Sequence, residues 1–286
     1  MRLRIRIIIA AVLLAFISPG CKKTKSTEEI LLKAEDKLNI TYGDNNKQVL
    51  DLYLPEKRTE DTKVVLLIHG GFWTAGDKSD LTLYVKTLQN SGYAVANINY
   101  RLATGGAENV HPAQINDIAK AISFISGKSA EWHISPNKFG LIGASAGAHL
   151  ALLYTYAYNN DDKVKAVISI AGPTNFNDTR SQTEVQKLII TNFLGKTQQQ
   201  DPALYISASP ITHVSASSKA TLLIHGKEDM IVPYQQASDL KVKLDFFKVP
   251  NEIYLVEGAG HENVISPANT VIAFGKVLAW LDTYLK

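Results

Sequence analysis

Short, continuous apolar runs alternate with longer amphipathic segments along most of this chain of 286 residues, and this alternation constrains the fold most strongly. An uninterrupted apolar run of about four to eight residues is typical of a strand that is buried on both faces. Strands that alternate with helices favour a mostly parallel, twisted sheet covered by helices on both faces. We expect such strands at 64–68, 93–99, 139–142, 164–170, 220–224 and 252–256, and helices at 78–90, 112–126, 146–158, 234–246 and 264–285.

The other segments predict where this α/β domain begins and how it is elaborated. Residues 38–42 and 48–54 alternate around a Gly-Asp-Asn turn, which is typical of a hairpin. The stretch 173–218 contains helical fragments and no convincing strand, so we expect a short cap inserted over one end of the sheet. The sequence therefore predicts one domain over 38–286, preceded by a polar tether at 21–37.

The first twenty residues resemble an export signal. Three arginines within the first six residues precede an uncharged apolar run that is too short to span a bilayer comfortably. Cys21, the chain's lone cysteine, follows, and the segment resembles a bacterial lipoprotein signal, although Ser18 and Pro19 depart from that pattern. An ordinary cleaved signal is the alternative. We expect a signal peptide over 1–20, lipidation at Cys21, and a membrane-anchored protein in the periplasm or at the surface of a bacterium.

The charge of the chain argues against a nucleic-acid partner. The same three arginines account for the whole formal net charge of +3, so the rest of the chain carries equal numbers of basic and acidic residues. Binding to nucleic acid usually needs a basic surface. We therefore expect a partner of another kind.

The most informative motif is Gly-Ala-Ser-Ala-Gly at 143–147. It follows the apolar run 139–142 and opens a helical stretch, which is the strand–turn–helix context of a nucleophile elbow. Such a turn is tight, and it needs small residues on either side of the nucleophile. The motif predicts Ser145 as a catalytic nucleophile.

A serine nucleophile needs a base and a carboxylate that orients the base. Of the three histidines that follow the expected helix at 146–158, His261 lies in a loop of small residues between the last expected strand and the closing helix. His225 ends an earlier strand and is interpreted as structural, while His213 lies in the cap. Asp229 follows the strand at 220–224 and is the expected acid, because it precedes His261 in the order typical of this motif. Glu228 is its neighbouring rival.

Backbone N–H groups are expected to stabilise the oxyanion of an acyl-transfer intermediate. His-Gly-Gly-Phe-Trp at 69–73 ends an early strand, and its glycines let the main chain approach the reacting carbonyl. The expected donors are the N–H groups of Gly71, Phe72 and Ala146. The alternative is a simple strand-to-loop turn in which Trp73 only packs.

No metal or nucleotide cofactor is expected. The remaining histidines at 69, 111, 133 and 149 show no ligand spacing with Cys, Asp or Glu, and the chain has no glycine-rich phosphate-binding loop.

Taken in order, the motifs at 69–73, 99–102 (Asn-Tyr-Arg-Leu), 143–147, 226–233 and 260–261 resemble the esterase/lipase branch of the α/β-hydrolases. That branch includes carboxylesterases related to hormone-sensitive lipase, acetyl-xylan and feruloyl esterases, and kynurenine formamidases. Two departures concern the subfamily. Phe72 replaces the third glycine of the His-Gly-Gly-Gly form, and residues 103–110 lack the Ala-Pro-Glu that often follows Tyr-Arg-Leu.

The resemblance implies a serine carboxylesterase that acts on small acyl groups, such as acetyl or feruloyl groups on polysaccharide. A formamidase or small amidase, a peptidase, and a non-catalytic binding protein that keeps the fold are the alternatives. The short cap favours a compact acyl pocket over the long groove of a lipase. Its expected apolar wall consists of Phe176, Leu188, Ile189, Ile190, Phe193 and Leu194.

Overall fold

The computed structural model describes residues 32–178, 182–264 and 267–286. The expected signal peptide, Cys21 and most of the expected tether lie outside these residues. The first strand begins at Glu35, so the last three residues of the expected tether belong to the sheet.

The domain is built on one eight-stranded sheet with the order β1-β2-β4-β3-β5-β6-β7-β8. The six strands from β3 onward are parallel, whereas β2 pairs antiparallel with both β1 and β4. This arrangement confirms the expected mostly parallel sheet of the α/β-hydrolase fold. The strands are β1 (Glu35–Thr41), β2 (Val49–Leu54), β3 (Val64–Ile68), β4 (Ala94–Ile98), β5 (Phe139–Ala144), β6 (Val164–Ile170), β7 (Ala220–Gly226) and β8 (Asn251–Val256).

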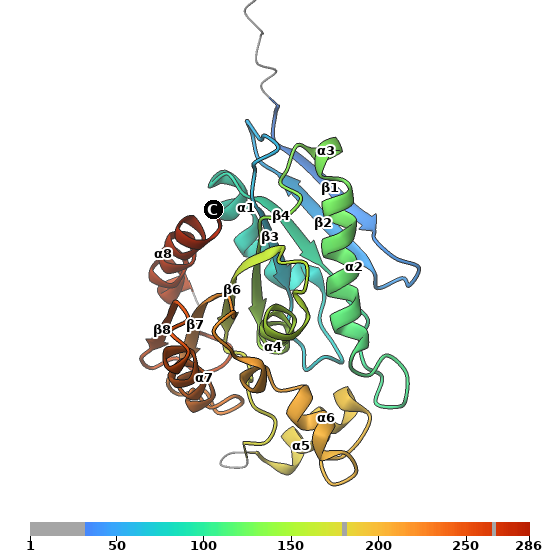
Figure 1. The fold of residues 1–286 in the computed structure, drawn as a ribbon, viewed down its shortest axis with the longest axis vertical. Coiled ribbons are helices and arrows are strands. Elements are labelled where there is room, and N and C mark those ends of the chain that lie inside the picture. The colour runs from blue at the N-terminus through green and yellow to red at the C-terminus, as the bar shows by residue number, and fades with distance from the viewer. Residues whose placement is uncertain (1–31, 179–181, 265–266) are drawn as a thin grey trace, which may run out of the picture. The chain divides into compact units, whose positions relative to one another are not determined.

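Helices cover both faces of the sheet (Figure 1). Alternate side chains of β3 enter two separate cores: Val64, Leu66 and Ile68 pack with one set of helices, and Val65 and Leu67 with the other. This two-sided burial explains why the strands are continuously apolar. One core includes α2 (Ala113–Gly127), α4 (Ala146–Leu153) and α7 (Gln235–Phe246), and the other includes α1 (Thr82–Asn90) and α8 (Pro267–Tyr284).

Each expected helix is present, with small differences at its ends. The stretch 146–158 divides into α4 and a π-helical turn, Tyr154–Tyr158. A short helix that the sequence analysis missed, α3 (Ser129–Trp132), follows α2 directly.

The segment between β6 and β7 forms the cap. It contains α5 (Glu184–Leu194), α6 (Pro202–Ser207) and a 3₁₀ turn at Pro210–His213, with no strand among its described residues. Figure 1 shows α5 and α6 together at one end of the domain. The cap begins where β6 ends, at the edge of the sheet to which the parallel strands also lead Ser145 and Asp229.

Candidate active site

Ser145 occupies a strained turn between β5 and α4. Its backbone has φ 51° and ψ −117°, a conformation that residues with a side chain rarely adopt. The turn is tight enough to exclude side chains on both sides. A Cβ atom at Gly143 would lie 2.2 Å from the carbonyl oxygen of Gly147, and one at Gly147 would lie 2.1 Å from the carbonyl oxygen of Ile68. Both glycines are therefore required by the close approach of the strand, the turn and the helix.

Ser145, His261 and Asp229 lie in a continuous chain of hydrogen bonds. The Oγ atom of Ser145 is 2.9 Å from Nε2 of His261, and Nδ1 of His261 is 2.7 Å from Oδ2 of Asp229. Ser145 follows β5, Asp229 follows β7 and His261 follows β8, so three parallel strands deliver them to the same edge of the sheet. These distances suit proton transfer from the serine hydroxyl to the imidazole.

Asp229 is buried, and both of its carboxylate oxygens accept hydrogen bonds. Its Oδ1 atom accepts the N–H groups of Ile231 at 2.9 Å and Val232 at 2.8 Å. Its Oδ2 atom faces His261 and, at 3.3 Å, Nε2 of His225. Burial alone would raise the pKa of this carboxyl group, but the bonds from the two histidines and from Val232 outweigh it and hold the pKa well below its usual value. Asp229 therefore stays ionised at neutral pH.

His225, interpreted from the sequence as structural, is also a neighbour of the acid. Its Nε2 atom lies 2.7 Å from the carbonyl oxygen of Val232. Because a carbonyl oxygen can only accept, Nε2 carries a hydrogen, and this nitrogen also lies 3.3 Å from Oδ2 of Asp229. The signal that could have revealed this contact is the spacing of four residues between His225 and Asp229, across the turn that ends β7. Glu228, in contrast, is exposed, and its N–H binds the carbonyl oxygen of Ala259.

The segment after β3 passes beside the nucleophile. A Cβ atom at Gly70 would lie 3.1 Å from the carbonyl oxygen of Ala144 and 3.3 Å from the Cβ atom of Ser145, so a side chain here would crowd the nucleophile turn. Gly71 and Phe72 both have positive φ values, 101° and 56°. The hydroxyl of Tyr100 donates to the carbonyl oxygen of His69 at 2.9 Å and holds the start of this loop.

Ala146 is the first residue of α4, so its N–H has no acceptor within the helix. Phe72 and Ala146 line the same pocket as Ser145. The structure thus brings Phe72 and Ala146 beside the serine, and Gly71 directly precedes Phe72 in the loop.

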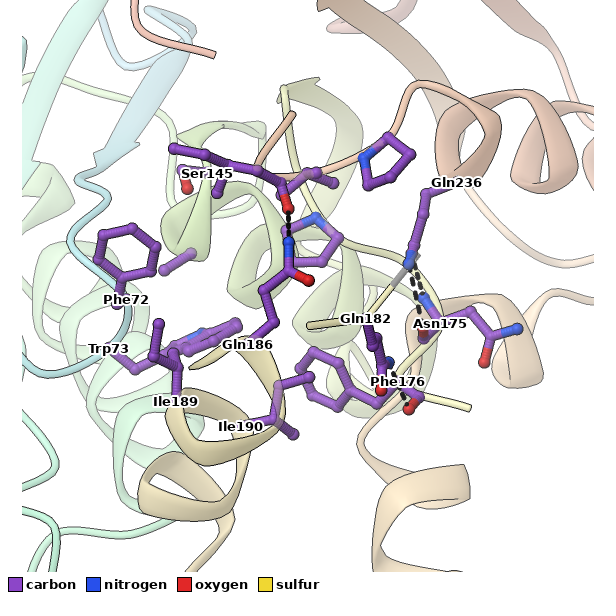
Figure 2. A pocket seen from close by; sticks show the side chains of 15 residues that line it. Phe72, Trp73, Ser145, Asn175, Phe176, Gln182, Gln186, Ile189, Ile190 and Gln236 are labelled. Carbon is purple, nitrogen blue, oxygen red and sulfur yellow. Dashed lines mark hydrogen bonds between the residues drawn. The ribbon is translucent and has the colours of Figure 1, made fainter. Parts of the chain in front are cut away.

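A pocket lined mainly by apolar side chains opens beside Ser145 (Figure 2). The cap contributes Phe176, Ile189 and Ile190 to its wall, as expected. Three other expected wall residues do not line it. Leu188 is 60% exposed on the outer face of α5, while Phe193 and Leu194 are buried in the core beneath the cap. The continuous run 188–190 wraps around α5, so its three side chains cannot all face the pocket.

The described residues contain no group of three histidine, cysteine, aspartate or glutamate side chains that could hold a metal ion. Among the same residues, no helix has the length and apolar character that a bilayer span requires.

The sheet, the turn at Ser145 and the order of serine, acid and histidine define an α/β-hydrolase. Within that class, the chain belongs to the BD-FAE family, whose model matches residues 50–244.

Two similar proteins carry the names of ester-cleaving enzymes. A probable carboxylic ester hydrolase of Mycobacterium tuberculosis, LipM, is 29% identical over 218 residues, which are 70% of this chain and 49% of the relative. A probable isoprenylcysteine alpha-carbonyl methylesterase of Arabidopsis thaliana is 25% identical over 244 residues, which are 79% of this chain and 51% of the relative. The chain thus spans about half the length of these two relatives.

Solved structures share the fold. A bifunctional GH43-CE protein of Bacteroides eggerthii is 26% identical, with a TM-score of 0.76 over 85% of this chain and 35% of the other. A truncated carbohydrate esterase from gut microbiota has a TM-score of 0.72 at 24% identity, over 88% of this chain and 98% of the other.

Proposed function

We propose that this chain is a serine carboxylesterase, with Ser145 as nucleophile, His261 as base and Asp229 as the acid that orients the base. The observation that carries the proposal is the hydrogen-bonded chain from Ser145 through His261 to an ionised Asp229, with Ser145 itself lining the pocket.

The reaction proceeds through an acyl-enzyme. The Ser145 oxygen attacks the ester carbonyl carbon while Nε2 of His261 takes the serine proton, and the carbonyl oxygen becomes an oxyanion. The N–H groups of Gly71, Phe72 and Ala146 are the proposed donors to that oxyanion. His261 then returns the proton to the leaving alcohol. Water, deprotonated by His261, attacks the acyl carbon and releases the carboxylic acid together with free Ser145.

The proposed substrates are esters of small acyl groups, such as acetyl or feruloyl groups on a polysaccharide. Two observations support this choice. The cap leaves a compact, mainly apolar pocket beside Ser145, and two of the structural neighbours are a GH43-CE protein and a carbohydrate esterase. An apolar pocket with a few amide groups suits an acyl chain better than a charged substrate.

Hydrolysis of a panel of p-nitrophenyl esters, acetylated xylan and N-formylkynurenine tests the proposal. The wild type is expected to cleave the acetyl esters, and Ser145→Ala is expected to lower kcat by a factor on the order of 10³ or more. A fluorophosphonate probe should label the wild type and leave Ser145→Ala unlabelled. A folded wild type that neither reacts with the probe nor cleaves any ester would identify a binding protein. A preference for the formamide would identify a formamidase.

We further propose export and attachment to a membrane through a lipid on Cys21. The support is the order of the first residues: arginines, an apolar run and then the cysteine. Full-length protein made in a bacterium should incorporate labelled fatty acid and fractionate with membranes, and Cys21→Ser should do neither. Wild-type protein that is free in the periplasm or the medium would contradict the anchor.

A further inference from the structure

The side chain of Gln186 joins the cap to the loop that carries the acid. Its Nε2 atom donates to the carbonyl oxygen of Ile231 at 2.6 Å, and both residues line the pocket beside Ser145. Figure 2 shows the Gln186 side chain extending from α5 into the space between Ser145 and the cap residues Ile189 and Ile190. The amide therefore occupies room that an acyl chain on Ser145 would otherwise use.

The orientation of this amide is determined at both ends. Gln186 is the third residue of α5, and its Oε1 atom accepts the N–H of Thr183 at 2.6 Å, while the Thr183 side chain accepts the N–H of Gln186. A flipped amide would set its NH₂ group against the Thr183 N–H and its oxygen against the Ile231 carbonyl. Both bonds would be lost, so the side chain has one favoured position.

The neighbouring pocket amides bind elsewhere. Gln182 donates to the carbonyl oxygen of Phe176 at 2.9 Å. The buried Gln236 accepts the N–H groups of Thr174 and Asn175, both at 2.8 Å. These two side chains brace the wall formed by residues 174–176, whereas Gln186 spans from α5 to the acid loop.

The far end of the Gln186 bridge is itself fixed. Ile231 accepts from Gln186 through its carbonyl oxygen and donates its N–H to Oδ1 of Asp229 at 2.9 Å. An acyl chain long enough to push Gln186 aside would break the hydrogen bond from Gln186 to Ile231, which joins α5 to this loop. The obstruction is thus anchored on one side by a helix terminus and on the other by the carboxylate that orients His261.

We propose that Gln186 is the residue that limits acyl-chain length in this pocket. The inference rests on the esterase function proposed above and adds a specific determinant to it. Each methylene that gains an apolar site is worth about a fourfold increase in kcat/KM. Removing the amide should therefore favour longer acyl esters in a graded way.

The test is a series of p-nitrophenyl esters from acetate to octanoate, expressed as the kcat/KM of each ester relative to acetate. Gln186→Ala should raise the hexanoate-to-acetate ratio by about tenfold or more, since at least two methylenes gain space. Gln186→Asn, which shortens the side chain by one methylene, should give an intermediate ratio. Gln198→Ala removes another cap glutamine, one that donates to Asn177 outside the pocket, and should leave the ratio unchanged.

The outcomes separate this inference from the proposed function. One outcome is a folded Gln186→Ala or Gln186→Asn protein that cleaves the acetate ester and still shows the wild-type hexanoate-to-acetate ratio of kcat/KM. That result would overturn the role of Gln186 and leave the esterase proposal standing. A wild-type maximum at octanoate would overturn it too, because no length limit would exist. A wild type that cleaves none of the esters would remove both proposals. Circular dichroism and thermal melting confirm that each variant is folded.

Discussion

Replacing Asp229 with asparagine should abolish most of the activity through hydrogen bonding, with little change of shape. The new side-chain amide would keep its carbonyl oxygen toward the N–H groups of Ile231 and Val232, which lie 2.9 and 2.8 Å from Oδ1 in the wild type. Its NH₂ group would then face His261 and His225, at positions where the wild type has an acceptor 2.7 and 3.3 Å away. The N–H groups of both histidines would therefore oppose another donor.

His261 can relieve this conflict only by moving its hydrogen from Nδ1 to Nε2. Nε2 is the atom 2.9 Å from Ser145 Oγ, and a protonated Nε2 cannot accept the serine proton. His225 cannot change tautomer in the same way, because its Nε2 hydrogen binds the Val232 carbonyl. We expect kcat to fall by about 10⁴, the size of the effect of a wrong histidine tautomer in a serine triad. An opposed donor pair at His225 should also destabilise the fold by about 1–3 kcal/mol.

Steady-state hydrolysis of p-nitrophenyl acetate at pH 7 measures the effect, with KM expected near the wild-type value because the pocket is untouched. Glu228→Gln is the matched control: it makes the same chemical change on the exposed neighbour and should stay within about twofold of the wild type. Folded Asp229→Asn protein with kcat within about tenfold of the wild type would refute the reasoning.

Three further changes test other parts of the structure. His225→Leu removes the N–H that binds the Val232 carbonyl and lies beside Asp229, and it should lower kcat by about tenfold; His225→Gln keeps a donor and should recover most of the activity, so equal losses would indicate a purely structural role. Gly147→Ala places a Cβ atom 2.1 Å from a carbonyl oxygen and should lower the free energy of unfolding by about 1–3 kcal/mol or more, whereas Gly127→Ala meets no atom within 4 Å and should be tolerated in urea denaturation. Burial lowers the pKa of His149 to about 3, below its unfolded value of 6.5, so the unfolded state binds the extra proton first and stability should fall as pH decreases from about 6.5 toward 3. Urea midpoints at pH 7 and pH 5 measure this loss, which should be smaller in His149→Phe; equal wild-type midpoints would contradict it.

The sequence predicted the sheet well because its strands are buried on both faces, which makes each a continuous apolar run such as 64–68. It also placed Ser145, Asp229 and His261 at strand ends, where parallel topology brings them together. The sequence could not predict which way a side chain points within a continuous apolar run or in a loop. Leu188 in the run 188–190 faces solvent, and the contact of His225 with Asp229 depends on how the loop after β7 turns back. Both depend on tertiary structure: the spacing of four residues between His225 and Asp229 permits their contact, but it does not by itself predict it.

His149, which is outside the proposed triad, connects the cap to the loop after β3. The indole N–H of Trp73, in the loop after β3, donates to Nδ1 of His149 at 3.2 Å, and Nε2 of His149 donates to the carbonyl oxygen of Ala208 at 2.8 Å. His149 lies on α4, one helical turn beyond Ser145, and stacks on Phe176 of the cap at 4.6 Å between ring centroids.

Both bonds require the neutral tautomer with its hydrogen on Nε2, because Nδ1 must accept from the indole. Burial favours this neutral form, and the low pKa of His149 maintains it at neutral and mildly acidic pH. Trp73 also stacks on Phe193 of α5, at 4.5 Å. One neutral imidazole thus connects the loop of proposed oxyanion donors, the nucleophile helix and the cap. These contacts hold the loop after β3 and the pocket wall in one arrangement. For the proposed donors, such preorganisation is the condition under which N–H groups stabilise an oxyanion without the cost of reorganisation.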